Sequence, residues 1–155
     1  MKKIIAATIA LVLLGGTLFA QNIKAVPEKD VTAKFVKDFH NQQKDASDVA
    51  WWQIDSLTFK VTFLDADKSR QAMILSNKGT ETHFFIDKKY YPAAIRDTVS
   101  HLFPDFTIDD VWVRKVRNKM TYQAKIVKMG GFLWWRKIKE SKTLNWEVDG
   151  KYIGE

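Results

Sequence analysis

The sequence predicts an α+β protein in which two tandem helix-plus-four-strand repeats form one curved antiparallel sheet, with the helices on one face. Two amphipathic stretches, led by Pro27 and Pro92, predict the helices, because proline suits the first position of a helix. Runs of alternating apolar and polar residues follow each stretch and predict strands. This order occurs twice, over 26–86 and 90–153, so two similar units are expected to share one sheet.

Both helices are expected to bury one apolar stripe, and Pro104 ends the second because it cannot continue a helix. Apolar residues recur every three or four positions along both stretches. They are Val31, Phe35 and Phe39 in the first stretch, and Ile95, Val99, Leu102 and Phe103 in the second.

Eight strands are expected, and 58–64 is the clearest because Phe59, Val61 and Phe63 alternate with Lys60 and Thr62. The others are expected over 49–55, 70–75, 80–86, 110–117, 121–129, 132–139 and 144–148, with a short segment at 152–153. In the strand over 144–148, the side chains of Leu144, Trp146 and Val148 are expected to point inward.

Residues 1–20 have the pattern of a secretory signal peptide: a Lys-Lys start, an apolar run over 4–14, and Ala20 at the expected cleavage position. Cleavage between Ala20 and Gln21 would leave one domain over 21–155. The apolar run is too short for a bilayer, which needs about 20 residues. We therefore expect a periplasmic or secreted protein with no membrane span in the mature chain. The chain has no cysteine, so its stability cannot depend on disulfides.

The charge is concentrated in one segment. Residues 111–142 contain ten basic side chains and Glu140 as their only acid. Such an excess favours an anionic partner. The alternative is that lysines on strands keep sheet edges from pairing with other chains.

The order of motifs resembles the beta-lactamase-inhibitor-like, PepSY-like family of secreted proteins. The motifs are Val26-Pro27-x-x-x-Val31-x-x-x-Phe35 and Tyr91-Pro92-Ala93-Ala94-Ile95, each followed by four short strands and a turn of the Asp-Gly-Lys or Asn-Lys-Gly kind. The resemblance covers nearly the whole mature chain. It implies a tandem repeat forming one curved sheet, and protein binding. No motif identifies an inhibitory residue.

No catalytic residue, cofactor or metal site is expected. The sequence contains no nucleophile elbow and no glycine-rich phosphate loop, and His40, His83 and His101 are too dispersed for a zinc site. The segment from Asp65 resembles the start of a calcium loop, but Arg70 stands where that loop needs glycine.

A binding role is therefore expected, and tryptophans and basic residues are its best candidates. Adjacent residues on a strand point to opposite faces, so one tryptophan of Trp51-Trp52 and one of Trp134-Trp135 should reach the open face of the sheet. The alternative is that the second tryptophan of each pair packs under a loop or at a sheet edge. Aromatic and arginine side chains are favoured at binding interfaces. The candidate residues are Trp52, Lys60, Trp112, Arg114, Lys125, Trp134 and Arg136.

We expect the partner to be a protein, bound in an inhibitor-like manner, or an anionic envelope component. Nucleic acid is not expected because the protein is exported. Two alternatives remain open: a small envelope enzyme with an unrecognised pocket, and a structural or stress-related envelope protein without a specific ligand.

Overall fold

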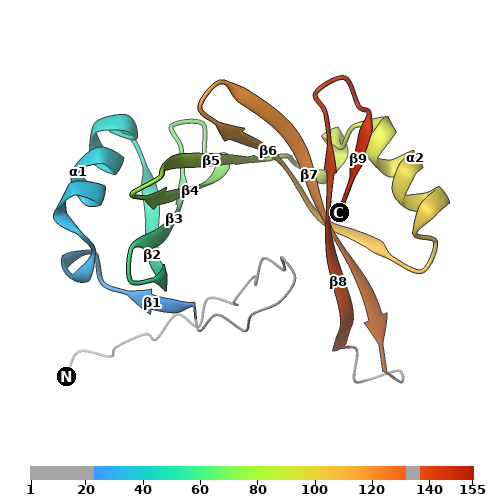
Figure 1. Ribbon diagram of the computed structural model, residues 1–155, viewed down its shortest axis with the longest axis horizontal. Coiled ribbons are helices and arrows are strands. Elements are labelled where there is room, and N and C mark those ends of the chain that lie inside the picture. The colour runs from blue at the N-terminus through green and yellow to red at the C-terminus, as the bar shows by residue number, and fades with distance from the viewer. Residues whose placement is uncertain (1–22, 132–136) are drawn as a thin grey trace.

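The computed structural model describes residues 23–131 and 137–155 as one open antiparallel sheet with two helices (Figure 1). The nine strands lie in the sheet in chain order, so each strand pairs with its neighbour in the sequence. Their bounds are β1 Lys24–Val26, β2 Ser47–Asp55, β3 Thr58–Leu64, β4 Arg70–Ser76, β5 Gly79–Phe85, β6 Thr107–Val116, β7 Lys119–Gly130, β8 Lys137–Trp146 and β9 Tyr152–Gly154. The helices are α1 Ala33–Gln42 and α2 Ala93–Leu102.

Both helices cover the same face of the sheet, on the outer side of its arch (Figure 1). The strand register explains this placement. Val61 of β3 lies opposite Trp51 of β2 and Met73 of β4, and all three side chains pack beneath α1. The register carries the same face through β5 and β6 to Val111, which packs beneath α2. Within the described residues, the opposite face of the sheet carries no helix, as the sequence predicts for an antiparallel sheet.

Two apolar clusters, one beneath each helix, form the core. The side chain of Phe39 is fully buried beneath α1 and makes edge-on contacts with Trp51 and Phe63, at centroid distances of 5.3 and 5.2 Å. Such aromatic pairs contribute roughly 0.5–1.5 kcal/mol beyond the burial of their area. Beneath α2, the fully buried Trp146 donates its indole N–H to the hydroxyl of Thr98 at 3.3 Å. The core needs no disulfide because large aromatic side chains fill it.

The start of the first helix differs from the prediction. Pro27 does not begin α1; residues Glu28–Asp30 form a 3₁₀ turn, Val31 is extended, and the helix begins at Ala33. The reason is the backbone of Pro27, which has a ψ of 148° and is therefore extended rather than helical. Pro92 does not begin α2 either: its ψ is 138°, and the helix starts one residue later, at Ala93.

Two predicted inward positions are exposed. Leu102 is 53% exposed, because Phe103 leaves helical geometry and packs against the core in its place. Val148 is 59% exposed, because the chain turns after Trp146 and the amide of Gly150 bonds to the carbonyl of Glu147 at 3.0 Å.

Most strands were predicted to within a few residues, and 58–64 was predicted with the observed bounds. The prediction of two separate strands over 132–139 and 144–148 is wrong. Residues 132–136 lie outside the described residues, and from Lys137 onward β8 continues to Trp146 without a break. Its pairing with the long strand β7 runs from Lys137 to Trp146 with one register shift, which keeps the segment extended. The short strand β1 was not predicted.

Neither α1 nor α2 is long and apolar enough to cross a membrane, within 23–131 and 137–155.

Candidate binding face

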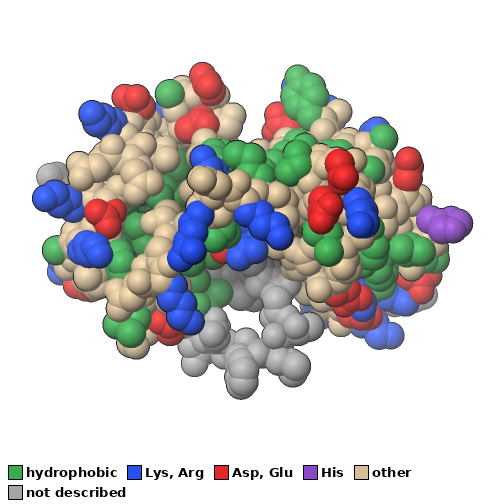
Figure 2. Space-filling view, turned by 45° about the horizontal axis from the view of Figure 1, so that its top comes forward, with side chains coloured by type: hydrophobic (Ala, Val, Ile, Leu, Met, Phe, Trp, Pro, Cys, Tyr) green, Lys and Arg blue, Asp and Glu red, His purple; other side chains and the backbone are tan. Residues whose placement is uncertain are grey.

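The face of the sheet that carries no helix, here called the open face, contains a row of six side chains from β2 to β7. The register places them opposite one another in the order Trp52, Lys60, Ile74, Glu81, Val116 and Lys119. We call these residues the Lys60 row. Figure 2 shows Lys and Arg side chains grouped at the middle of the molecule, between its two halves.

The register places five of the seven predicted binding residues on the open face: Trp52, Lys60, Trp112, Arg114 and Lys125. The first tryptophan pair divides as expected, since Trp51 is in the core and the half-buried Trp52 is on the open face. Trp134 and Arg136 lie outside the described residues, as do the predicted cleavage positions Ala20 and Gln21.

Trp112 is on the open face but is not an exposed platform, because only 1% of its surface is accessible. Its ring stacks with that of His83 and contacts Phe85, both at centroid distances of 5.8 Å. Its indole N–H donates to Gln123 Oε1 at 2.9 Å, and Gln123 donates to Asn145 Oδ1 at 2.6 Å. Trp112 therefore packs the side chains of β5, β6 and β7 together on the open face, and these contacts leave little of its ring accessible to a ligand.

Three acidic side chains on or beside the open face each pair with a basic one. Arg70 bonds to Asp110, and its guanidinium lies 4.1 Å from the ring centroid of Phe85. The other two pairs join Lys125 Nζ to Asp109 at 2.8 Å and Arg114 to Glu81 at 2.6 Å. The buried Lys125 is thus neutralised and is not the free contact that the sequence suggested.

The pKa values of the paired acids reflect both burial and pairing. Burial opposes ionisation of Glu81, but hydrogen bonds from His83 and Arg114 outweigh it and lower its pKa to about 2. At Asp110, burial outweighs the attraction of Arg70 and raises the pKa. Glu81 therefore remains a carboxylate at neutral pH and holds the guanidinium of Arg114 in place.

Lys60 differs from these cations because its ammonium has no hydrogen-bond or ion-pair partner among the described residues. Burial, together with the positive charge of Arg70, lowers the pKa of Lys60 to about 8. The half-buried Trp52 and Ile74 flank it on the neighbouring strands. The result is a partly desolvated cation with an aromatic and an aliphatic neighbour.

His83 is buried on the same face and leaves one ring nitrogen without a partner. Its Nε2 lies 2.5 Å from Glu81 Oε1. A carboxylate only accepts, so Nε2 carries the proton. Its Nδ1 is buried and finds no hydrogen-bond partner in the described part of the chain.

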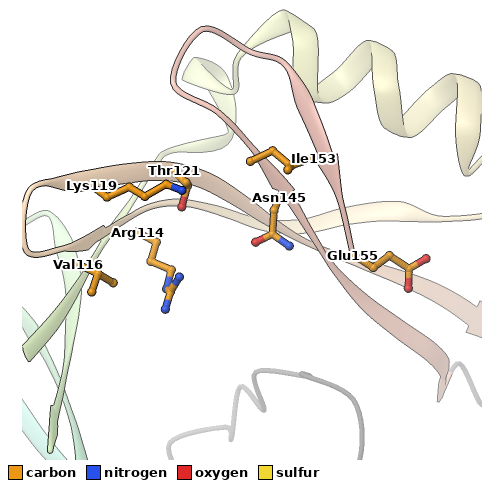
Figure 3. Close-up of a pocket in the computed structure, with 7 residues that line it drawn as sticks. All are labelled: Arg114, Val116, Lys119, Thr121, Asn145, Ile153 and Glu155. Carbon is orange, nitrogen blue, oxygen red and sulfur yellow. The ribbon is translucent and has the colours of Figure 1, made fainter. Parts of the chain in front are cut away.

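A cavity of about 260 Å³ opens on the open face between β6, β7, β8 and β9 (Figure 3). It is lined by Arg114, Val116, Lys119, Thr121, Asn145, Ile153 and Glu155. In Figure 3 the side chain of Lys119 runs along β7 toward Thr121. Sequence reasoning placed Lys119 between two predicted strands, 110–117 and 121–129, and did not name Thr121 or Asn145 as binding residues. The alternation of the strand could have placed Thr121 with Gln123 and Lys125, but no local signal brings β9 to the cavity.

Within 23–131 and 137–155, no three His, Asp or Glu side chains come close enough together to hold a metal ion. No family model, curated protein or solved structure matches this chain. The open face must therefore be interpreted from its own chemistry.

Proposed function

We propose that the protein is an exported, non-catalytic binding protein whose open face holds an anionic group of a partner protein or envelope component. The observation that carries the proposal is the ammonium of Lys60, which has no partner among the described residues, on a face where three acids are each paired with another cation. Burying a charge without a partner is costly. A bound anion would supply the missing partner and recover part of that cost.

The neighbours of Lys60 support a partner that also has apolar surface. Trp52 and Ile74 lie on either side of the ammonium, and both are half-buried. Binding energy at interfaces concentrates on desolvated aromatic and cationic side chains of this kind. An acidic side chain within an apolar segment of a protein would satisfy both features.

We also propose that the fold arose by tandem duplication, as the family resemblance implies. The two 3₁₀ turns, Glu28–Asp30 and Lys88–Tyr90, are offset by 60 residues, and so are the starts of α1 and α2. The same offset relates Trp52 to Trp112, both on the open face. This agreement supports the resemblance to the PepSY-like family and a common origin of the two halves of the binding face.

Export to the periplasm or outside the cell completes the proposal. The signal pattern over 1–20 supports it. Intact-mass measurement of the protein from its native host should give a chain that begins at Gln21. A membrane-embedded chain that still carries residues 1–20 would contradict export.

The binding proposal can be tested by capture from an envelope extract with immobilised protein of residues 21–155. Lys60→Met keeps most of the side-chain volume but removes the charge, and it should abolish or strongly weaken retention of the captured partner. Lys37→Met is the matched control, because Lys37 is exposed on the opposite, helix-covered side. Retention by wild type should decrease with added salt, as expected for a charged contact. Equal retention by wild type and Lys60→Met would refute the role of Lys60.

A further inference from the structure

We infer that the cavity between β6, β7, β8 and β9 is a binding site for a compact oxyanion, meaning a carboxylate or phosphate group. The inference rests on the proposed use of the open face, but it concerns a site separate from Lys60. Lys119 and Lys60 lie at positions four strands apart in the same row. Lys60 is not among the residues that line the cavity, so the cavity is a site of its own.

The donors of the cavity are suited to an oxyanion. Arg114 uses its Nη2 for Glu81, which fixes the guanidinium and leaves other N–H groups without an acceptor in the described part of the chain. The exposed Lys119 and the hydroxyl of Thr121 likewise lack a described partner. A guanidinium, an ammonium and a hydroxyl that border one space are the donors that phosphate and carboxylate groups use.

Among the described side chains that line the cavity, one cation has no partner. Glu155 lines the cavity, but its Oε1 accepts from Lys142 at 2.7 Å. Glu81 is occupied by Arg114 and His83. Lys119 therefore remains the charged lining side chain without a described partner, and an anion bound in the cavity could pair with it.

The remaining lining and the volume limit the size of the ligand. The amide of Asn145 is already used, since it accepts from Gln123 and donates to the carbonyl of Gly154 at 3.3 Å. Val116 and Ile153 supply apolar walls. A volume of about 260 Å³ is below the range of ~300–1,000 Å³ typical of drug-sized ligands. The cavity therefore suits an anionic head group with a short apolar attachment.

The site can be tested by NMR titration of ¹⁵N-labelled residues 21–155 with sodium phosphate, at an ionic strength held constant with sodium chloride. The backbone amides of Arg114, Lys119, Thr121 and Asn145 should shift in a saturable manner, with a Kd on the order of 1–10 mM. Lys119→Met should raise this Kd about tenfold. Thr121→Val should raise it about threefold. Lys37→Met should leave it within about twofold, because Lys37 is exposed on the helix-covered side of the sheet.

Two further titrations distinguish the sources of the anion. Tighter binding of glycerol 3-phosphate than of N-acetylglutamate would assign the site to phosphate-bearing envelope components. The reverse order would assign it to acidic groups of a protein. Absence of saturable shifts with all three probes, or an unchanged Kd in a folded Lys119→Met variant, would overturn the inference. Neither result would affect the capture test of Lys60, so the two proposals fail separately.

Discussion

Replacing Lys60 by methionine should stabilise the protein at neutral pH, although Lys60 is the residue that we propose for binding. Its ammonium is partly desolvated and has no partner in the described part of the chain, and its pKa falls from an ordinary value of 10.5 to about 8. At about 1.4 kcal/mol per pKa unit, this difference corresponds to roughly 3 kcal/mol. Because Lys60 is only half-buried and solvent screens its charge, we expect a gain of about 1–3 kcal/mol at pH 7.

The pH dependence of this gain identifies its cause. A lysine with a lowered pKa binds its proton more weakly in the folded than in the unfolded state, so the wild-type protein gains stability as pH rises from about 8 toward 10.5. Below pH 8 the full penalty applies. The stability difference between Lys60→Met and wild type should therefore be largest at pH 7 and fall below about 1 kcal/mol by pH 10.

Urea unfolding followed by tryptophan fluorescence at both pH values measures this difference. Comparing the variant with wild type cancels the titration of other groups, to the extent that they do not interact with Lys60. Lys37→Met should change stability by less than about 0.5 kcal/mol at either pH, because Lys37 is exposed on α1. A Lys60→Met variant that is less stable than wild type, or equally more stable at pH 7 and pH 10, would refute the assignment of a desolvated ammonium.

Three further changes test other parts of the fold. Glu81→Gln should lower the free energy of unfolding by about 1–3 kcal/mol at pH 7. Because Glu81 becomes protonated in wild type as pH falls from 4.5 toward 2, the stability difference between the two proteins should disappear over that range. Unfolding of both proteins at a series of acidic pH values measures this difference. Phe39→Ala should cost about 3–5 kcal/mol in urea unfolding, because the side chain is fully buried; a cost below 1 kcal/mol would contradict the packing. Residues 21–86 alone expose the edge of β5 that pairs with β6, so size-exclusion chromatography should show aggregation; a soluble fragment that unfolds cooperatively would argue for two independent domains.

Local patterns in the sequence predicted the strands and the two faces well. The alternation over 58–64 depends only on neighbouring residues, and it placed Lys60 and Phe59 on opposite faces correctly. The start of α1 was missed because the backbone of Pro27 is extended, and the extended Val31 separates the 3₁₀ turn Glu28–Asp30 from the helix. The sequence analysis divided β8 into two strands because the residues at its middle are polar. Pairing with β7 keeps these residues extended, so the strand is not interrupted.

The state of the candidate binding residues could not be predicted, because it depends on partners far away in the sequence. Arg70 and Asp110 are 40 residues apart, and Arg114 and Glu81 are 33 apart. Alternation places such residues on a face but cannot tell a neutralised cation from a free one. The burial of Trp112 likewise follows from contacts with His83, Phe85 and Gln123 on neighbouring strands.

The order of the strands has a consequence for folding kinetics. Because β1 to β9 lie in the sheet in chain order, every strand pair joins segments that are adjacent in the sequence. The longest connections are those that contain α1 and α2, at 27–46 and 86–106. Sheets dominated by distant pairings fold slowly because long loops must close first. This sheet avoids that step, so we expect it to fold quickly for a β-rich protein, with strands adding one after another from either half.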